Sequence, residues 1–268
     1  MKIHLVLYRG DSIPAVVRGS TDPHRALAEH FCGLGLAARS FSGKIRRSEF
    51  DKPLEQVLAH VGHEKGTPEQ ALAEHSPLIS FSESLASAFS FMEGTGRPNL
   101  TRCRWLHQAT HFVWRLKLDR SDLLPMASKL PSYEGWYWFR YRVDPVNCPV
   151  HIMRRIEDAR DMEASTGERH ELASSLGPYA AAAHAADDSS DHYAIIIDAC
   201  TFIERNCRGK RLYEQALHLA RRHREWLLYP YDISEDGCPT GVLQMNKNLS
   251  IAALYRWRSE DASKQTTA

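Results

Sequence analysis

Three short segments of the sequence carry polar residues whose types could do chemistry together. Arg9 follows an apolar N-terminal run, Ser80 and Ser82 alternate with apolar residues, and Glu225 opens a late apolar run. A guanidinium is a planar fork of donors that suits phosphate groups. A carboxylate can stabilise positive charge that develops during bond cleavage, and a hydroxyl can hold that carboxylate in place. The set is therefore a candidate catalytic constellation.

Each of these residues also has a simpler interpretation. Arg9 could be a surface residue in a hairpin turn, and Glu225 could be a solvated residue that starts a strand. Ser80 and Ser82 could form the solvated face of an edge strand, next to a serine that caps the following helix. For any one residue alone the simpler interpretation is favoured. Three of them in this order, each at the edge of an expected strand, favour a functional site.

The segments that carry these residues are expected to be strands. Residues 3–8 alternate apolar side chains as a strand does, and turn residues over 9–12 are expected to end it. Residues 77–82 form a short strand in which the two serines share one face. Residues 225–230 form a late apolar strand that ends at a proline. The candidate site should therefore lie where three strands come together.

The other elements follow from hydrophobic periodicity and from capping signals. Helices are expected over 14–17, 23–36, 53–63, 83–92, 193–205 and 210–222, and strands over 111–118 and 136–143. Strands and helices mix without a βαβ rhythm, so the expected fold class is α+β. We expect one domain over 1–258, with a partly helical insertion at about 126–219 that includes an Ala- and Asp-rich stretch over 157–192. A polar tail covers 259–268.

The composition is that of an ordinary globular protein. The chain has 268 residues, of which 43% are hydrophobic and 25% charged, and its formal net charge is +1. These values exclude a long disordered chain, a collagen and a coiled coil. No apolar run approaches the roughly 20 residues of a membrane span, and the N-terminus is unlike a signal peptide. We therefore expect a cytoplasmic protein without a membrane partner, with delivery into a target cell left open.

Cysteine and histidine spacing gives no clear metal site. The six cysteines show no paired spacing, so reduced thiols are expected. His60 with His63, and His107 with His111, have ligand-like spacing, but neither pair comes with a paired cysteine or an HExxH glutamate. We expect no metal and interpret these histidines as surface or capping residues.

Together, residues 7–12, 78–82 and 224–230 resemble the ADP-ribosyltransferase superfamily in its Arg–Ser–Glu branch. That branch has an aromatic-Arg pair on the first strand, a Ser-Thr-Ser-like strand leading into a helix, and a catalytic Glu on a later strand. The continuation from Asp11 to Pro14 is similar to the start of pertussis- and pierisin-like toxins. The resemblance covers about 3–125 and 220–258. The sequence departs from the pattern at the middle Thr, which is Phe81 here, and two residues before the Glu, where His223 replaces Gln or Glu.

The resemblance implies an ADP-ribosyltransferase-like split β-sandwich with flanking helices, and an enzyme that cleaves NAD between nicotinamide and ribose. NAD would be a substrate, and no metal would be needed. Glu225 would be catalytic, because a carboxylate bonded to a ribose hydroxyl holds it more strongly as an oxocarbenium-like ribose develops. Arg9 would bind the phosphates and ribose of NAD, and Ser80 would hydrogen-bond Glu225 and hold its rotamer.

Further NAD contacts are implied around these three residues. Ser82 would line the same face as Ser80. The Tyr8 carbonyl or the Gly10 backbone would grip the nicotinamide amide, because a residue without a side chain allows close approach. Phe89, or another aromatic residue, would stack on the nicotinamide ring.

The acceptor of ADP-ribose could be RNA, DNA or protein, with nucleic acid slightly favoured. His223 and Arg224 precede the glutamate, where the acceptor-recognition loop of this family lies, and Arg224 belongs to a basic run. Trp138 and Arg140 share one face of an expected strand, where an aromatic and a guanidinium could stack on bases. A packed strand with snorkelling arginines is the simpler interpretation of that strand. Such proteins are commonly toxins, effectors or defence factors, so an antitoxin or immunity partner is also possible.

Three alternatives stay open. The first is an NAD glycohydrolase, which transfers ADP-ribose to water. The second is a catalytically silent relative that acts as a binding module. The third is an unrelated α+β domain with accidental matches, in which Arg9, Ser80 and Glu225 would not meet in one cleft.

Overall fold

The structure, a computed structural model, describes residues 4–23, 26–27, 52–63, 76–89, 92, 99–103, 106–125, 132–141, 192–233, 239–242 and 249–258. The expected helix over 23–36 and the stretch over 157–192 lie almost wholly outside the described residues.

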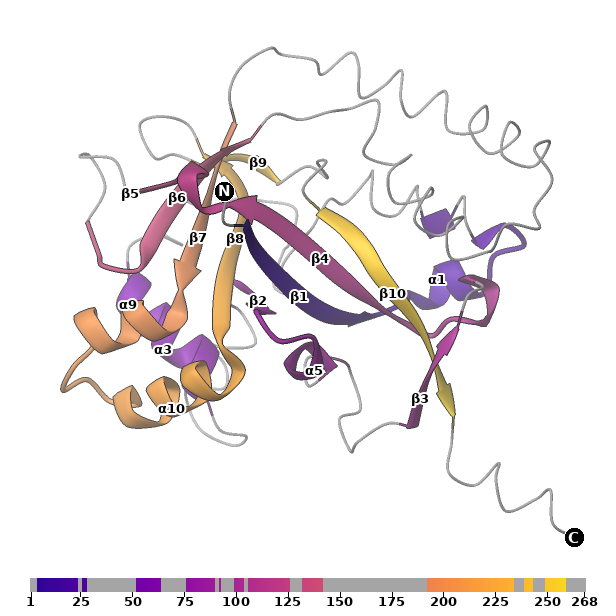
Figure 1. Cartoon of the computed structure of the whole chain (residues 1–268), viewed down its shortest axis with the longest axis horizontal. Coiled ribbons are helices and arrows are strands. Elements are labelled where there is room, and N and C mark those ends of the chain that lie inside the picture. The colour runs from indigo at the N-terminus through magenta and orange to yellow at the C-terminus, as the bar shows by residue number, and fades with distance from the viewer. Residues whose placement is uncertain are drawn as a thin grey trace, which may run out of the picture.

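The fold mixes helices with a large antiparallel sheet, which agrees with the expected α+β class. Its strands are β1 (His4–Ser12), β2 (Ile79–Ser82), β3 (Asn99–Cys103), β4 (His111–Asp119), β5 (Leu123–Pro125), β6 (Trp136–Tyr141), β7 (His192–Asp198), β8 (Glu225–Ile233), β9 (Pro239–Val242) and β10 (Leu249–Arg258). The strand order is β3-β10-β4-β1-β2-β8-β7-β6-β5, and β9 pairs with β8 beside this path. Figure 1 shows β5 to β8 grouped on one side and β1, β4, β10 and β3 on the other.

The sheet is almost divided between β1 and β2. The two strands share one register pair, Tyr8 with Ser82, whereas β1 pairs with β4 along its whole length from His4 to Ser12. We call β3, β10, β4 and β1 the Arg9 half, and β2, β8, β7, β6, β5 and β9 the Glu225 half. The line between β1 and β2 is called the seam.

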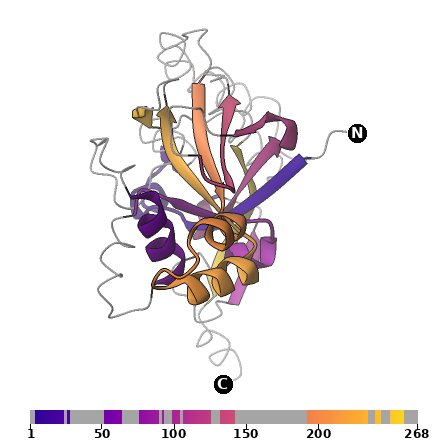
Figure 2. The ribbon, with the colours of Figure 1, turned by 90° about the vertical axis from the view of Figure 1, so that its left-hand side faces the viewer.

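Two hydrophobic clusters stabilise the two halves of the sheet. The first contains side chains from both, including Leu7 and Trp114 of the Arg9 half and Phe81 and Leu228 of the Glu225 half. The second packs alternate residues of β7 and β8 against three helices, α3 (Pro53–Gly62), α9 (Ala199–Asn206) and α10 (Tyr213–His223). Figure 2 shows these helices gathered below the strands. The Glu225 half is therefore covered on both faces.

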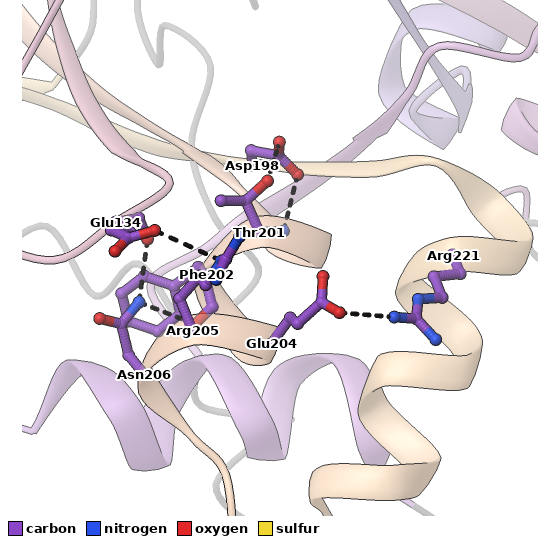
Figure 3. Close-up of polar contacts among 8 residues, drawn as sticks. All are labelled: Glu134, Asp198, Thr201, Phe202, Glu204, Arg205, Asn206 and Arg221. Atoms are coloured by element: carbon purple, nitrogen blue, oxygen red, sulfur yellow. Dashed lines mark hydrogen bonds and ion pairs between the residues drawn. The ribbon is translucent and has the colours of Figure 1, made fainter.

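Side-chain caps and an ion pair fix the helix layer (Figure 3). Asp198 caps α9, because its carboxylate accepts from the backbone N–H of Thr201 at 3.2 Å and from its hydroxyl at 2.7 Å. Glu204 of α9 and Arg221 of α10 form an ion pair with an N–O distance of 2.9 Å. The remaining helices are α1 (Ala15–Arg18) and α5 (Leu85–Ala88), with 3₁₀ turns at Leu106–Gln108 and Arg120–Asp122. Among the described helices, none is both long enough and apolar enough to cross a membrane.

Several sequence-based expectations were wrong. Residues 9–12 do not end the first strand, because they continue the ladder with β4. Residues 192–198 are strand β7 rather than the start of a helix. The helix expected over 83–92 is only α5. Strands β3 and β10 were not anticipated.

The range at about 126–219, expected to be a partly helical insertion, contributes described elements to the sheet and to the core. Strand β7 lies between β6 and β8 in the sheet. Helices α9 and α10 supply core side chains such as Phe202 and Leu217. These elements are integral to the Glu225 half.

Candidate functional site

The three residues singled out from the sequence meet at the seam. Tyr8 of β1 pairs with Ser82 of β2, and Ser82 pairs with Glu225 of β8. Arg9 follows Tyr8, and its Nη1 donates to the backbone carbonyl of Ser80 at 3.1 Å. Residues separated by 71 and 145 positions in the sequence thus come together at the seam.

Ser80 holds Glu225 directly. The two residues are diagonal neighbours on adjacent strands, because Ser82 lies opposite Glu225. Ser80 Oγ donates to Glu225 Oε1 at 2.6 Å, and both residues are buried. This is the hydrogen bond expected from the sequence, and its short length is typical of a hydroxyl bonded to a carboxylate. Among the described residues, no other group hydrogen-bonds the Glu225 side chain.

His60 of α3 is a site residue that the sequence interpretation missed. Its Nε2 lies 2.8 Å from Ser80 Oγ, and its Nδ1 lies 2.7 Å from Ser76 Oγ. The ring is therefore fixed between two serines rather than free on the surface. The apolar residues of α3 at helical spacing were the available signal, because His60 stands beside that face. His111 is likewise buried, whereas His63 and His107 are exposed as expected.

The donors and acceptors around His60 set the direction of each proton. The Ser80 hydroxyl has one hydrogen, which it donates to Glu225. Its oxygen must therefore accept the hydrogen bond from His60 Nε2–H. His60 Nδ1 then carries no proton and accepts from Ser76 Oγ–H, while Ser76 Oγ accepts from the backbone N–H of Leu78 at 3.2 Å. This order requires a neutral ring. Burial, with Arg9 and His63 adding repulsion, lowers the pKa of His60 from 6.5 to about 3, so the ring is neutral at physiological pH.

Burial acts in the opposite direction on Glu225. Loss of water raises the pKa of its carboxyl from 4.5 to about 7, although the Ser80 hydrogen bond and the Arg9 charge both lower it. A carboxyl that titrates near neutrality beside a fixed cation is typical of a functional site.

Arg9 supplies the only positive charge that the described contacts bring to this carboxylate. Its side chain is 15% exposed, and its Nε forms a 3.5 Å ion pair with Asp11 but makes no hydrogen bond in the described part of the chain. The guanidinium therefore has donor capacity left for a ligand.

Ser82 supports the turn that precedes Glu225. Its hydroxyl is fully buried, donates to the backbone carbonyl of His223 at 2.5 Å and accepts from the N–H of Ser84. Arg224 adopts a left-handed conformation with φ 47° and is exposed. The Ser82 hydroxyl is thus engaged with backbone on both sides of the turn.

The lack of a side chain at Gly10 is needed for close packing. A Cβ there would clash with the carbonyl oxygen of Ala88 and lie 2.6 Å from Met92 Cγ, so the chain itself fills the space beside Gly10. Tyr8 is half-buried on β1. Phe89 lies edge-on to Tyr255 with ring centroids 5.1 Å apart, and no described contact joins it to Glu225.

The expected base-stacking strand is part of the core. Trp136 is buried, and it stacks on Tyr133 and packs against Phe202. Trp138 is half-buried against the same cluster, so the simpler interpretation of a packed strand holds for both tryptophans. Arg140 lies in β6, but its side chain is outside what the structure describes.

The described residues contain no cluster of three or more metal-ligating side chains. Comparisons with protein families, with characterised proteins and with solved structures find no match to this chain. The arrangement at the seam is therefore the basis for any statement about function.

Proposed function

We propose that the chain is an ADP-ribosyltransferase that cleaves NAD at the nicotinamide–ribose bond and transfers ADP-ribose to a macromolecular acceptor. The split sheet would then be an ADP-ribosyltransferase-like fold with its catalytic cleft at the seam. The observation that carries the proposal is the buried hydrogen bond from Ser80 to Glu225, formed beside Arg9.

The proposed roles follow from the geometry of the carboxylate. Ser80 occupies Oε1, so Oε2 is the oxygen that would accept a hydrogen bond from a ribose hydroxyl. The bond between ribose C1′ and nicotinamide nitrogen breaks, and nicotinamide leaves with the electron pair. Positive charge grows on the ribose and strengthens its interaction with Glu225. The acceptor atom then bonds to C1′ and releases its proton to solvent.

Arg9 would hold the other end of the substrate. Its Nε forms only an ion pair with Asp11 and no hydrogen bond to a described residue, and a phosphate oxygen could replace Asp11 as the anionic partner of the guanidinium. Arg9 also fixes β2 through the Ser80 carbonyl, so phosphate binding and the placement of Glu225 would be linked.

The role of Glu225 requires the ionised carboxylate, which gives the activity a pH dependence. Because the pKa of Glu225 is about 7, the rate of NAD cleavage should rise as the pH passes from 6 to 8. A Glu225→Gln variant should show no such rise.

The test is nicotinamide release from NAD by wild type, Glu225→Gln and the control Asp122→Asn, which changes an exposed carboxylate in the 3₁₀ turn Arg120–Asp122. Each is assayed alone, with RNA, with DNA and with cell lysate. We expect a loss of about 100-fold or more in Glu225→Gln, comparable to the cost of removing one preorganised transition-state interaction, and wild-type rates in Asp122→Asn.

The pattern of acceptors distinguishes the alternatives. Release that requires an acceptor supports the transferase, and release without one indicates a glycohydrolase. Absence of release together with absence of NAD binding would contradict both, whereas NAD binding without release would indicate a silent binding module.

A further inference from the structure

Helices α9 and α10, with the loop between them, carry a strong local charge. Residues 199–224 contain seven Lys and Arg and only two Glu, an excess of five positive charges in a chain whose net charge is +1. The rest of the chain is therefore net negative. All seven basic side chains of this helical hairpin are exposed, namely those of Arg205, Arg208, Lys210, Arg211, Arg221, Arg222 and Arg224.

Of these seven cations, three have a described acidic partner, Arg211 is also engaged in an interaction, and three form no ion pair with a described residue. Arg205 pairs with Glu134, Lys210 with Glu55 and Arg221 with Glu204, as Figure 3 shows for the first and last. By contrast, Arg208, Arg222 and Arg224 form no ion pair with any described residue. These side chains retain the donor fork that binds phosphate bidentately.

The unpaired arginines lie before α10 and at its C-terminal end. Arg208 is in the α9–α10 loop, five residues before the helix begins, Arg222 is in its last turn, and Arg224 is at its C-terminal cap. A helix of 11 residues is about 16 Å long, and phosphates repeat about every 3.4 Å along one strand of a duplex. The helix thus spans roughly five phosphates. Arg224 immediately precedes Glu225, so this surface ends at the candidate site.

From this charge pattern we propose that α9 and α10 form a docking surface for the phosphodiester backbone of a nucleic acid, which the site at Glu225 then modifies. The catalytic part of this inference rests on the proposed function, but the docking itself does not. Phosphate contacts position a chain without reading its sequence, and these arginines would act in that way.

The burial of the hairpin favours nucleic acid over a lipid surface. Its apolar residues, such as Ala216 and Leu217, are buried in the second hydrophobic cluster. No exposed large hydrophobic side chain of the described residues lies on the hairpin. A helix that binds a bilayer needs an apolar face to insert, whereas a phosphate backbone needs only charge and donors.

The test measures the fluorescence anisotropy of labelled 20-nucleotide oligo(U) and oligo(dT) at several salt concentrations. The test variant is Arg208→Gln/Arg222→Gln, and the matched control is Arg18→Gln/Arg120→Gln, which removes two exposed arginines of other elements. We expect the test variant to bind about tenfold more weakly. Its plot of log affinity against log salt should have a slope smaller by about 1.4, because each lost phosphate contact contributes about 0.7. The control should match wild type in affinity and slope. Whichever of oligo(U) and oligo(dT) binds more tightly identifies RNA or DNA as the preferred nucleic acid.

Two further measurements separate this proposal from the proposed function. Equal affinity and slope in wild type and the test variant would overturn the docking surface, as would tighter binding to phosphatidylserine vesicles or polyglutamate. Retained oligonucleotide binding by Glu225→Gln, without nicotinamide release, would support docking and catalysis as separate steps. Binding by wild type that never cleaves NAD would leave the docking surface supported and the transferase contradicted.

Discussion

The two halves of the sheet bury their strands differently. In β8 of the Glu225 half, residues Glu225 to Tyr229 are all buried, because hydrophobic clusters cover both faces. In β1 of the Arg9 half, buried residues alternate with partly exposed ones. The half with two covered faces contains the carboxylate, and the half with one more open face contains the guanidinium. Burial can raise the pKa of a carboxyl towards neutrality, whereas an arginine keeps its charge in either place.

The largest expected loss of stability follows from a substitution that disturbs the packing of α5 on the Arg9 half. Gly10→Ala should destabilise the protein by about 3 kcal/mol, because the new Cβ meets the backbone of Ala88, which cannot move aside easily. Gly62→Ala, in the helix layer of the Glu225 half, should cost less, because its Cβ would lie 2.9 Å from the Cβ of Ala216 and no nearer than 3.3 Å to backbone atoms. Urea unfolding measures both, with Gly19→Ala as a near-neutral control. An equal loss of unfolding free energy in Gly10→Ala and Gly62→Ala would contradict the expected difference between the two halves.

The next effect is the pH dependence that burial gives to Glu225. The folded pKa of about 7 lies above the ordinary 4.5, so the fold favours the protonated form and wild type loses stability as the pH rises through 7. A shift of this size corresponds to about 3 kcal/mol by pH 9. Glu225→Gln has no such ionisation and does not lose this stability. The difference in unfolding free energy, Glu225→Gln minus wild type, should therefore grow by up to about 3 kcal/mol between pH 5 and pH 9. Glu214→Gln, which is exposed, should show a constant difference.

Between pH 7.5 and pH 5, His60 should produce a smaller effect, about 2 kcal/mol, with the opposite pH dependence. Its folded pKa of about 3 lies below 6.5, so wild type loses stability as the pH falls from 6.5, because the unfolded ring gains a proton that the folded ring excludes. His60→Ala should remove this acid loss and cost 1–3 kcal/mol at pH 7.5, roughly the cost when two serine hydroxyls each lose one hydrogen-bond partner.

Activity measurements distinguish a role of His60 in positioning Ser80 from a role in packing alone. Nicotinamide release should fall about tenfold in kcat in His60→Ala, the lower range of general positioning effects, and His60→Gln should recover part of it because an amide can donate to Ser80. His63→Ala, an exposed neighbour, serves as the control. Unchanged kcat in His60→Ala would show that Ser80 holds Glu225 without help.

The smallest effect is at Ser76, at the far end of the same set of hydrogen bonds. Ser76→Ala should cost about 1 kcal/mol and reduce the population of the Nε2–H form of His60, because Nδ1 loses its donor. Nitrogen NMR shifts of the imidazole report this change. Ser82→Ala should leave the His60 ring unaffected, since Ser82 bonds to backbone on another part of β2. A shift of equal size in both variants would contradict the directional order.

The strands that carry the site could be predicted from the sequence better than the pairing between those strands. Alternation placed Ser80 and Ser82 on one face because a strand has a period of two, and this requires no knowledge of distant residues. The pairing of Ser82 with Glu225 depends on register between segments 143 residues apart, which no local pattern contains. The resemblance supplied that link, and the register itself comes from the structure.

The errors also have physical causes. Residues 194–197, Ala-Ile-Ile-Ile, were interpreted as helical because a continuous apolar run has no visible period, although β-branched residues favour a strand. The strand is apolar on both faces because β7 lies under α9 on one side and in the shared cluster on the other. His60 was missed because its role depends on two serines on another segment.

The seam described above has a mechanical consequence. Only one backbone register pair joins β1 to β2, so little of the cohesion between the halves there comes from the sheet ladder. The Arg9 side chain replaces the missing ladder contact by bonding to the Ser80 carbonyl, the same residue whose hydroxyl holds Glu225. Any movement that widens the gap between β1 and β2 therefore separates Arg9 from Ser80 and Glu225. A molecule that binds both Arg9 and Glu225 holds the two halves of the sheet together. Amide hydrogen exchange along β2 would then slow when such a molecule binds, with no helix required to move.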